Sequence, residues 1–196
     1  MLLESLLNNI SRKGIDLSLD EAQAIPQFFS QKKYRKNQYI LQEGEVAQYD
    51  QFVVKGLTRT YSMDEKGHEH IVRFAPEDWW TGDLASFLSQ KPTKYNVDCL
   101  EDTEVLRVTP DGLESLCERI PKMNKYFRIL YQRSIASFNQ RVSSAISLSA
   151  SDRYQEFIQK FAAIHHRVPD RYIASYLGIT PQSLSRIRGQ STGRKS

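Results

Sequence analysis

The segment Tyr172–Gly189 reads YIASYLGITPQSLSRIRG, and one helical pattern stops there only for another to begin within a few residues. Ala174 is small, as is needed where a second helix crosses closely. Gly178 can adopt a positive φ angle, which lets the first helix end abruptly. Thr180 is a favoured N-cap and Pro181 suits the first position of a new helix. The segment therefore predicts a helix-turn-helix.

The second predicted helix has an inner and an outer face. Leu184 and Ile187 lie three residues apart and are expected to face the first helix. The remaining positions are polar or basic, as a helix that enters a DNA major groove requires. The predicted DNA-contacting residues are Thr180, Gln182, Ser183, Ser185, Arg186 and Arg188.

Each of these residue types has a chemical reason to contact DNA. Gln182 and Arg186 are four residues apart and can form paired hydrogen bonds with adenine and guanine edges. Thr180 and Ser183 can bond phosphate through their hydroxyls, and Arg188 through its charge. The alternative is an ordinary helical hairpin with a polar outer surface.

Charge and composition limit the class of protein. The chain carries a net charge of +4, but residues 151–196 alone hold eight Lys/Arg against three acids, a net charge of +5. A basic end on a near-neutral body suggests an anionic partner. Two cysteines, Cys99 and Cys117, cannot form a disulfide framework. Because the chain also has no membrane-spanning apolar run and a poor signal-peptide start, we expect a cytoplasmic protein without a membrane partner.

Short strands are predicted from about Lys33 to Val108. Residues 57–63 alternate with a period of two, and turn signals recur along the region, for example at residues 64–67. Many short strands at such spacing indicate an antiparallel sandwich or barrel. Before them, Ser18 and Glu21 have capping-box spacing and predict a short helix.

A helical region follows Thr109-Pro110. No proline or glycine occurs between Pro121 and Ser149, which predicts one long helix. Its apolar line is close to a heptad seam. One interpretation is a helix that lies on its own barrel, and the other is a helix that also pairs with its twin in a homodimer. The line consists of Met123, Phe127, Tyr131, Ile135, Phe138, Val142 and Ala145.

Several motifs together resemble the cyclic-AMP receptor/fumarate–nitrate regulator (Crp/Fnr) superfamily of bacterial transcription factors, and the branch common in Bacteroidetes in particular. The resemblance is carried by Asp152-Arg153-Tyr154, by RVPDRYIASYLGITPQSLSRIR, and by YILQEGE, GLTRTY, EKGHEH and WWTGDLASFL upstream. It implies an α+β protein with a cyclic-nucleotide-binding-type β-barrel or jelly roll at 1–120. A dimerisation helix at 121–150 and a helix-turn-helix domain at 151–196 complete it.

The C-terminus departs from the family pattern. Family members usually continue into a two-stranded wing, but only GQSTGRKS follows Arg188, so we expect the wing to be short or absent. A tail with Arg194 and Lys195 can partly substitute. The alternative function, motivated by this departure, is a ligand-binding signalling module that has lost operator recognition.

The resemblance also marks an effector pocket. In nucleotide-binding members a Gly-Glu-Leu turn holds the cyclic phosphate and an arginine neutralises it. Here the matching positions carry aspartate for glutamate and threonine for arginine, so we expect no usual binding of cyclic AMP; another small effector, or none, is expected. The matching residues are Gly82, Asp83, Leu84, Ala85, Thr93 and Lys94.

Other chemistry is weakly indicated. His68 and His70 have a spacing that metal-binding cupins use, but the further glutamate of that pattern is missing, so we expect no metal. No catalytic motif stands out, and we expect no enzyme and no fixed cofactor. The expected partners are double-stranded DNA, a second copy of the chain, and RNA polymerase through contacts that leave no signature.

Overall fold

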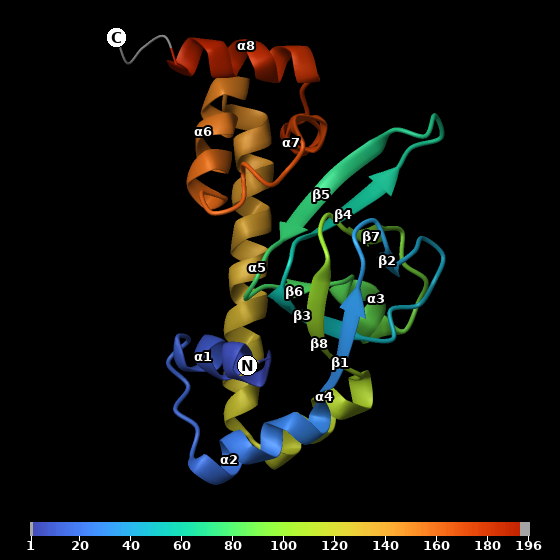
Figure 1. The fold of residues 1–196 in the computed structure, drawn as a ribbon, viewed down its shortest axis with the longest axis vertical. Coiled ribbons are helices and arrows are strands. Elements are labelled where there is room, and N and C mark those ends of the chain that lie inside the picture. The colour runs from blue at the N-terminus through green and yellow to red at the C-terminus, as the bar shows by residue number, and fades with distance from the viewer. Residues whose placement is uncertain (1, 193–196) are drawn as a thin grey trace. The chain divides into compact units, whose positions relative to one another are not determined.

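The computed structural model describes residues 2–192, which form two compact units (Figure 1). The sheet unit comprises Met1–Ser62 and Arg73–Gln132. The helical unit comprises Met63–Val72 and Arg133–Ser196. The division at 120 and 150 expected from the sequence stays a prediction. Among the described residues, no helix is both long and apolar enough to cross a membrane.

The described elements, in chain order, are α1 (Leu2–Ser11), α2 (Leu19–Ala24), the 3-10 helix η1 (Ile25–Phe28), β1 (Ser30–Tyr34), β2 (Tyr39–Leu41), β3 (Asp50–Lys55), β4 (Thr58–Met63), β5 (Glu69–Ala75), β6 (Trp80–Thr81), α3 (Leu84–Ser89), β7 (Asn96–Cys99), β8 (Thr103–Val108), α4 (Pro110–Arg119), α5 (Lys122–Ser147), α6 (Ala150–Lys160), α7 (Asp170–Leu177) and α8 (Pro181–Thr192).

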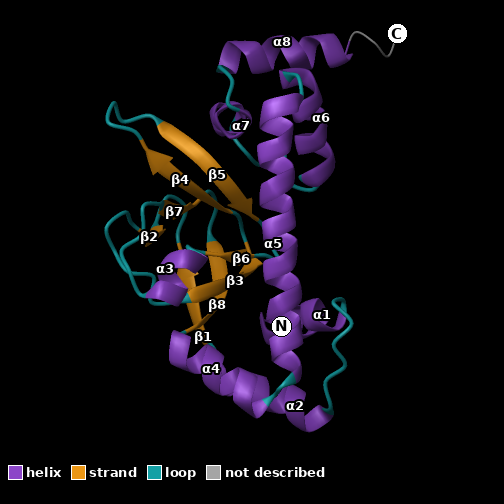
Figure 2. Cartoon of the chain, turned by 180° about the vertical axis from the view of Figure 1, so that it is seen from behind, coloured by secondary structure: helices purple, strands orange, loops and turns teal. Residues whose placement is uncertain are grey.

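The strands form two sheets and do not close into a barrel (Figure 2). One four-stranded sheet has the order β1-β8-β3-β6 and the other the order β2-β7-β4-β5. β8 pairs antiparallel with both β1 and β3, and β7 pairs antiparallel with β2 and β4. The expected antiparallel β architecture is therefore confirmed, while the closed-barrel form of it is corrected to two facing sheets.

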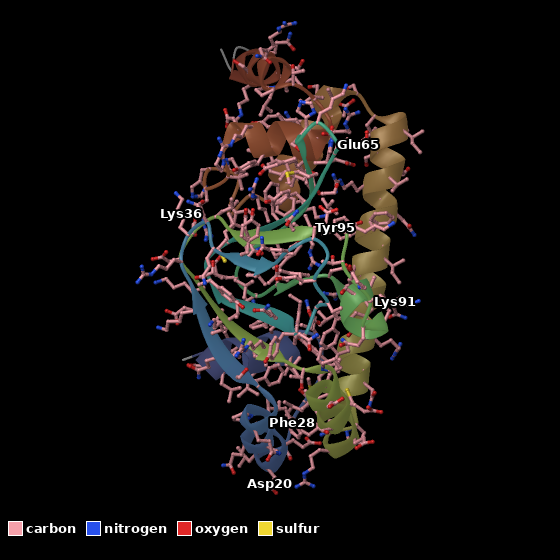
Figure 3. The ribbon with its side chains drawn as sticks, turned by 90° about the vertical axis from the view of Figure 1, so that its right-hand side faces the viewer. Asp20, Phe28, Lys36, Glu65, Lys91 and Tyr95 are labelled. Atoms are coloured by element: carbon pink, nitrogen blue, oxygen red, sulfur yellow. The ribbon has the colours of Figure 1, made fainter. Side chains whose placement is uncertain are left out.

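The helices α2 and α4 begin at the capping signals that the sequence shows. Ser18 caps α2, with its hydroxyl accepting from Glu21 N at 3.2 Å while the Glu21 carboxylate accepts from Ser18 N at 2.7 Å. Thr109 caps α4, which begins with Pro110. Side chains crowd the space between these elements (Figure 3). The predicted capping box and the cap-plus-proline start are both confirmed.

Aromatic side chains fill the core of the sheet unit and satisfy each other's polar atoms. Trp80 is 8% exposed, and its Nε1 donates to the hydroxyl of Tyr126 at 3.1 Å. That hydroxyl in turn donates to Asn9 Oδ1 at 2.9 Å. A buried indole N–H or phenol needs such a partner because an unpaired polar group in the core is costly. The chain of bonds ties α1 and the start of α5 to β6.

The apolar line on α5 divides into a covered and an uncovered part. Met123 and Phe127 are 0% and 4% exposed and belong to the core of the sheet unit, with Tyr131 packed against it. Further along, Ala145 is exposed, and so are four large apolar side chains. They are Ile135 (61% exposed), Phe138 (61%), Val142 (44%) and Ile146 (83%). The packing of α5 on its own core thus accounts only for the first half of the line.

In the helical unit, α6, α7 and α8 enclose a separate core. Phe157, Ile173 and Leu184 are 2%, 0% and 0% exposed. α6 begins at a Ser149 cap whose side chain accepts from Asp152 N. α7 packs against α8, and α6 packs against both. This small core holds the two helices of the predicted motif in fixed relation.

Candidate nucleic-acid interface

The turn between α7 and α8 has the geometry that its residues predict. Gly178 adopts φ 66°, and its N–H is bonded to the carbonyls of Ala174 and Ser175. A methyl group added at Gly178 would meet no atom within 4 Å, so the glycine is needed for its backbone conformation rather than for space. Thr180 Oγ1 accepts from Ser183 N at 3.2 Å and caps α8.

α8 has a buried and an exposed face. Leu184 is fully buried and Ile187 is 9% exposed, as expected for residues that face α7. Gln182, Ser185 and Arg186 are exposed. Gln182 and Arg186 share a face because they are four residues apart. Within the described residues, Arg186 has no hydrogen bond or ion pair, so its guanidinium is available to a ligand.

Thr180 and Ser183, two residues predicted to contact phosphate, form a hydrogen bond with each other. The Thr180 hydroxyl donates to Ser183 Oγ at 3.0 Å while it caps the helix. The Ser183 hydroxyl proton is therefore the one left to donate at this end of α8. Because the first turn of a helix also presents free N–H groups, the end remains suited to an anion.

Arg188 lies in a different environment from Arg186. Its Nη1 contacts both oxygens of Asp170, at 2.6 and 2.7 Å, and its Nε donates to the Tyr154 hydroxyl at 3.0 Å. Partial burial opposes ionisation, but the bonds to Tyr154 and Asp170 prevail and raise the pKa of Arg188. The predicted phosphate contact of Arg188 stays untested, and the predicted tail contacts of Arg194 and Lys195 lie outside the described residues.

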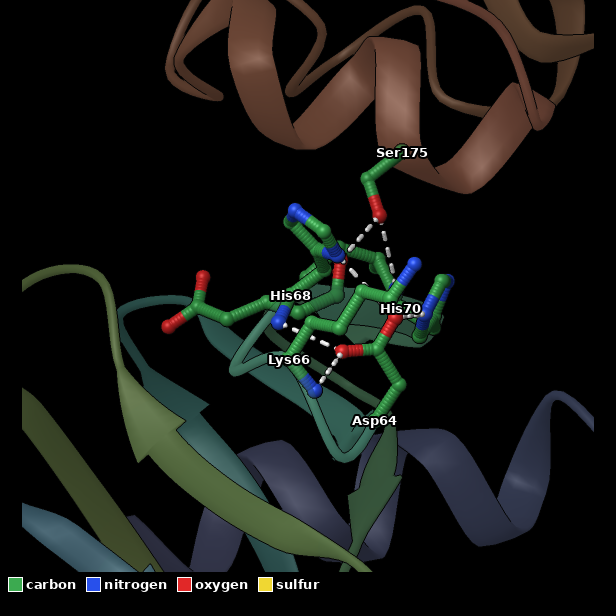
Figure 4. Close-up of polar contacts among 7 residues, drawn as sticks. Asp64, Lys66, His68, His70 and Ser175 are labelled. Atoms are coloured by element: carbon green, nitrogen blue, oxygen red, sulfur yellow. Dashed lines mark hydrogen bonds and ion pairs between the residues drawn. The ribbon is translucent and has the colours of Figure 1, made fainter.

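The helical unit contains one set of contacts that no sequence pattern indicated. Ser175 on α7 donates to the carbonyl of Glu69 at 2.7 Å and accepts from Ile71 N at 3.0 Å (Figure 4). Arg141 donates to the carbonyls of Val72, Ile71 and Tyr176, and desolvation lowers its pKa. These bonds fasten the first part of β5 to α7 and α5.

The histidine pair lies on the same hairpin, with His68 in the turn and His70 in β5. His68 Nδ1 and His70 Nε2 each lie 3.1 Å from Asp64 Oδ2. The Asp64 carboxylate also accepts from backbone N–H groups, of which that of His68 contributes most, and the pKa of Asp64 is held well below its usual range. In the described part of the chain, no group of three or more His, Cys, Asp or Glu side chains could hold a metal ion.

The predicted effector residues come together in the sheet unit, at the start of α3. Gly82 adopts φ 131°, a conformation that strains any other residue. Asp83 is the N-cap of α3: its Oδ1 accepts from Ala85 N at 3.0 Å. Its Oδ2 accepts from the Thr93 hydroxyl at 2.7 Å. Lys94 is exposed and Leu84 half-buried.

Thr93, the second partner of Asp83, is held in place by its own backbone. Thr93 is 3% exposed, and its backbone bonds to Gly44 and Glu45. It belongs to the loop between α3 and β7. The N–H of Ala85 in the first turn of α3 is thus bonded to the Asp83 carboxylate, and that carboxylate also accepts from the buried Thr93 hydroxyl. An incoming anion would have to displace Asp83 or lie against its charge.

Comparison with known proteins agrees with this organisation. Residues 31–120, just under half of the chain, match the model of the cyclic nucleotide-binding domain. The anaerobic regulatory protein of Haemophilus influenzae is 24% identical over 198 residues, which cover 93% of this chain and 76% of that protein. The regulatory protein HlyX of Actinobacillus pleuropneumoniae is 24% identical over 180 residues, 81% of this chain and 70% of that protein.

Solved structures share the fold. FixK2 from Bradyrhizobium japonicum superposes with a TM-score of 0.74 at 20% identity, covering 85% of this chain and 86% of that chain. The catabolite activator protein of Thermus thermophilus gives a TM-score of 0.58 at 18% identity, covering 93% and 87%.

The fold and these similarities support a DNA-binding transcription regulator. The resemblance to the Crp/Fnr superfamily, including its cyclic-nucleotide-binding-type domain, is thereby confirmed. The narrower likeness to a Bacteroidetes branch stays a prediction. The curated relatives are named as regulators, and the expectation of no enzyme activity stays a prediction.

Proposed function

We propose that this chain is a homodimeric regulator of the Crp/Fnr type that reads a palindromic DNA site with α8. Gln182 and Arg186 read base edges, and Thr180, Ser183 and Ser185 contact the backbone and the flanking groove wall. On a twofold axis the two α8 helices would address half-sites one DNA turn, roughly 34 Å, apart. RNA polymerase as a further partner and a cytoplasmic location belong to the same proposal.

One observation carries the base-reading assignment. α8 buries Leu184 and Ile187 against its own domain while Gln182, Ser185 and Arg186 remain exposed on the other side. A helix whose exposed face combines an amide with a guanidinium that has no partner among the described residues is suited to base edges. The absence of such a partner matters because an arginine that first had to break an ion pair would add little net free energy to base binding.

Enrichment of bound genomic fragments by the purified protein tests this function. We expect a palindromic consensus and, for Arg186→Ala, an affinity loss of about 1–3 kcal/mol with relaxed preference at one base of each half-site. Arg128→Ala removes an exposed positive charge outside α7 and α8 and is the matched control. An unselective wild-type protein, or unchanged base preference in Arg186→Ala, would contradict the assignment.

Salt dependence separates this proposal from the alternative of a signalling module without operator recognition. Specific binding should persist at moderate salt, because base contacts remain when phosphate attraction is screened. Binding that vanishes equally on all sequences as salt rises would favour the alternative.

The dimer part of the proposal is supported by the uncovered side chains of α5. Ile135, Phe138 and Val142 follow one another at spacings of three and four residues, as in a coiled-coil seam. Exposed apolar rows of this kind mark protein–protein contacts. In a twofold dimer the same row on a second copy of α5 can pack against it.

The sensor part of the proposal is that the sheet unit does not take cyclic AMP in the usual way. It is supported by the bonds that Asp83 accepts from Ala85 N and from the Thr93 hydroxyl, which engage this carboxylate and the Ala85 N–H group within the protein. The effector, where there is one, is a small molecule of another kind. Calorimetric titration with cyclic AMP is expected to give no heat of binding, and a micromolar affinity would overturn this part.

A further inference from the structure

We infer that Arg188 is a positioning residue: it fixes α8 on α6 and α7 through Asp170 and Tyr154, and it does not neutralise a DNA phosphate. The inference rests on the proposed DNA-reading role of α8. It differs from the expectation that the sequence alone raised for this residue.

The contacts of Arg188 join all three helices of the domain. Asp170 is the first residue of α7, and Arg188 Nη1 lies 2.6 and 2.7 Å from its two carboxylate oxygens. Tyr154 belongs to α6, is 8% exposed, and receives the Nε hydrogen bond of Arg188 at 3.0 Å. The planar, rigid fork of guanidinium donors suits a carboxylate and a hydroxyl at the same time, whereas an ammonium is a compact charge on a flexible stem.

Helix geometry separates Arg188 from the base-reading face. Successive residues of an α-helix are about 100° apart, so a residue two positions beyond Arg186 points to nearly the opposite side. Arg186 is exposed, whereas Arg188 is half-buried with its guanidinium carbon 5.7 Å from the centre of the Tyr154 ring. The two arginines therefore cannot serve the same surface.

Electrostatics also argue against a phosphate contact. A phosphate that approached Arg188 would meet the Asp170 carboxylate, whose side chain is 60% exposed. The paired charges cancel, so together they release few counterions from DNA. What the pair does supply is a fixed rotation of α8, and this rotation sets where Gln182 and Arg186 point.

Three variants and one control test the inference by DNA affinity as a function of salt on the enriched site. Arg188→Gln and Asp170→Asn should each weaken specific binding about 5- to 30-fold and reduce the preference for the specific site. The slope of log affinity against log salt should stay unchanged for both. The charge exchange Arg188→Asp with Asp170→Arg should recover part of the affinity, and Arg186→Ala is the control for a direct contact.

A phosphate contact predicts the opposite for the aspartate. Arg188→Gln would then lower the salt slope by about 1, and Asp170→Asn would leave affinity unchanged or raise it, because a negative charge near DNA is removed. That result would overturn the inference. So would weaker thermal stability in both variants with unchanged affinity and selectivity, which would indicate a merely structural bond. A wild-type protein without sequence preference would instead refute the DNA-reading proposal, and the inference with it.

Discussion

Truncation of Phe138 should break the proposed dimer. Phe138 is 61% exposed in the single chain. Taking roughly 200 Å² for a phenylalanine leaves about 120 Å² for a partner to cover. At ~25 cal/mol per Å² this is about 3 kcal/mol per copy, of which the alanine retains about a third. The loss is then about 4 kcal/mol per dimer, or roughly a thousandfold in the dissociation constant.

Sedimentation equilibrium at a series of concentrations measures this change. Since interface side chains are seldom covered completely, a weakening of at least about thirtyfold is the expected result. Leu88→Ala is the matched control, because Leu88 is also 61% exposed but lies on α3 in the sheet unit. An unchanged dimer in Phe138→Ala, or equal weakening in Leu88→Ala, would refute the assignment of the α5 row.

Three further substitutions test the physical account of the two units. Burial raises the pKa of Asp50 to about 7, although the positive charge of Arg73 opposes this, so the folded state holds the Asp50 proton more tightly than the unfolded chain does. The free energy of unfolding in urea should therefore fall as the pH rises from about 4 to about 7. Asp50→Asn should abolish this fall. Arg59 contacts the buried carboxylate of Asp98 at 2.8 Å, and Arg59→Met removes this positive partner. The free energy of unfolding should fall by about 3–5 kcal/mol in the same assay. The loss should be smaller in the double variant Arg59→Met with Asp98→Leu, because the buried negative charge is then removed as well. Arg141→Met removes the donor of the Ile71 and Val72 carbonyls and loosens this part of β5. Amide hydrogen exchange at 69–72 should therefore become more than tenfold faster, without a change in α1.

The sequence predicts the DNA-reading motif well because its determinants are local. A glycine with positive φ, a threonine cap and a proline at the first helical position each act within one turn of chain. Leu184 and Ile187 could be assigned to the inner face for the same reason, since helical periodicity alone fixes it. Gly178 and Thr180 behave in the structure as those rules require.

The pairing of strands far apart in the sequence could not be predicted in this way. β3 pairs with β8 across about fifty residues, and no alternation in either strand specifies that partner. The heptad line on α5 carries the same apolar signal throughout, yet Phe127 is buried in its own unit while Phe138 is exposed. Periodicity shows that a face must be covered but not by what.

Arg186 and Arg188 have different surroundings, which residue type alone does not show. Both are arginines on one basic helix, and a count of charge assigns both to DNA. Asp170 lies 18 residues before Arg188 in sequence, so the neutralising partner is invisible to local reading. The same holds for Asp83 and Thr93, which lie ten residues apart and are joined by a hydrogen bond within the predicted effector region. In both places a charge that a motif assigns to a ligand also has a partner inside the protein. If Arg188 is a positioning residue as we infer, Arg188→Gln should leave the salt slope of DNA binding unchanged.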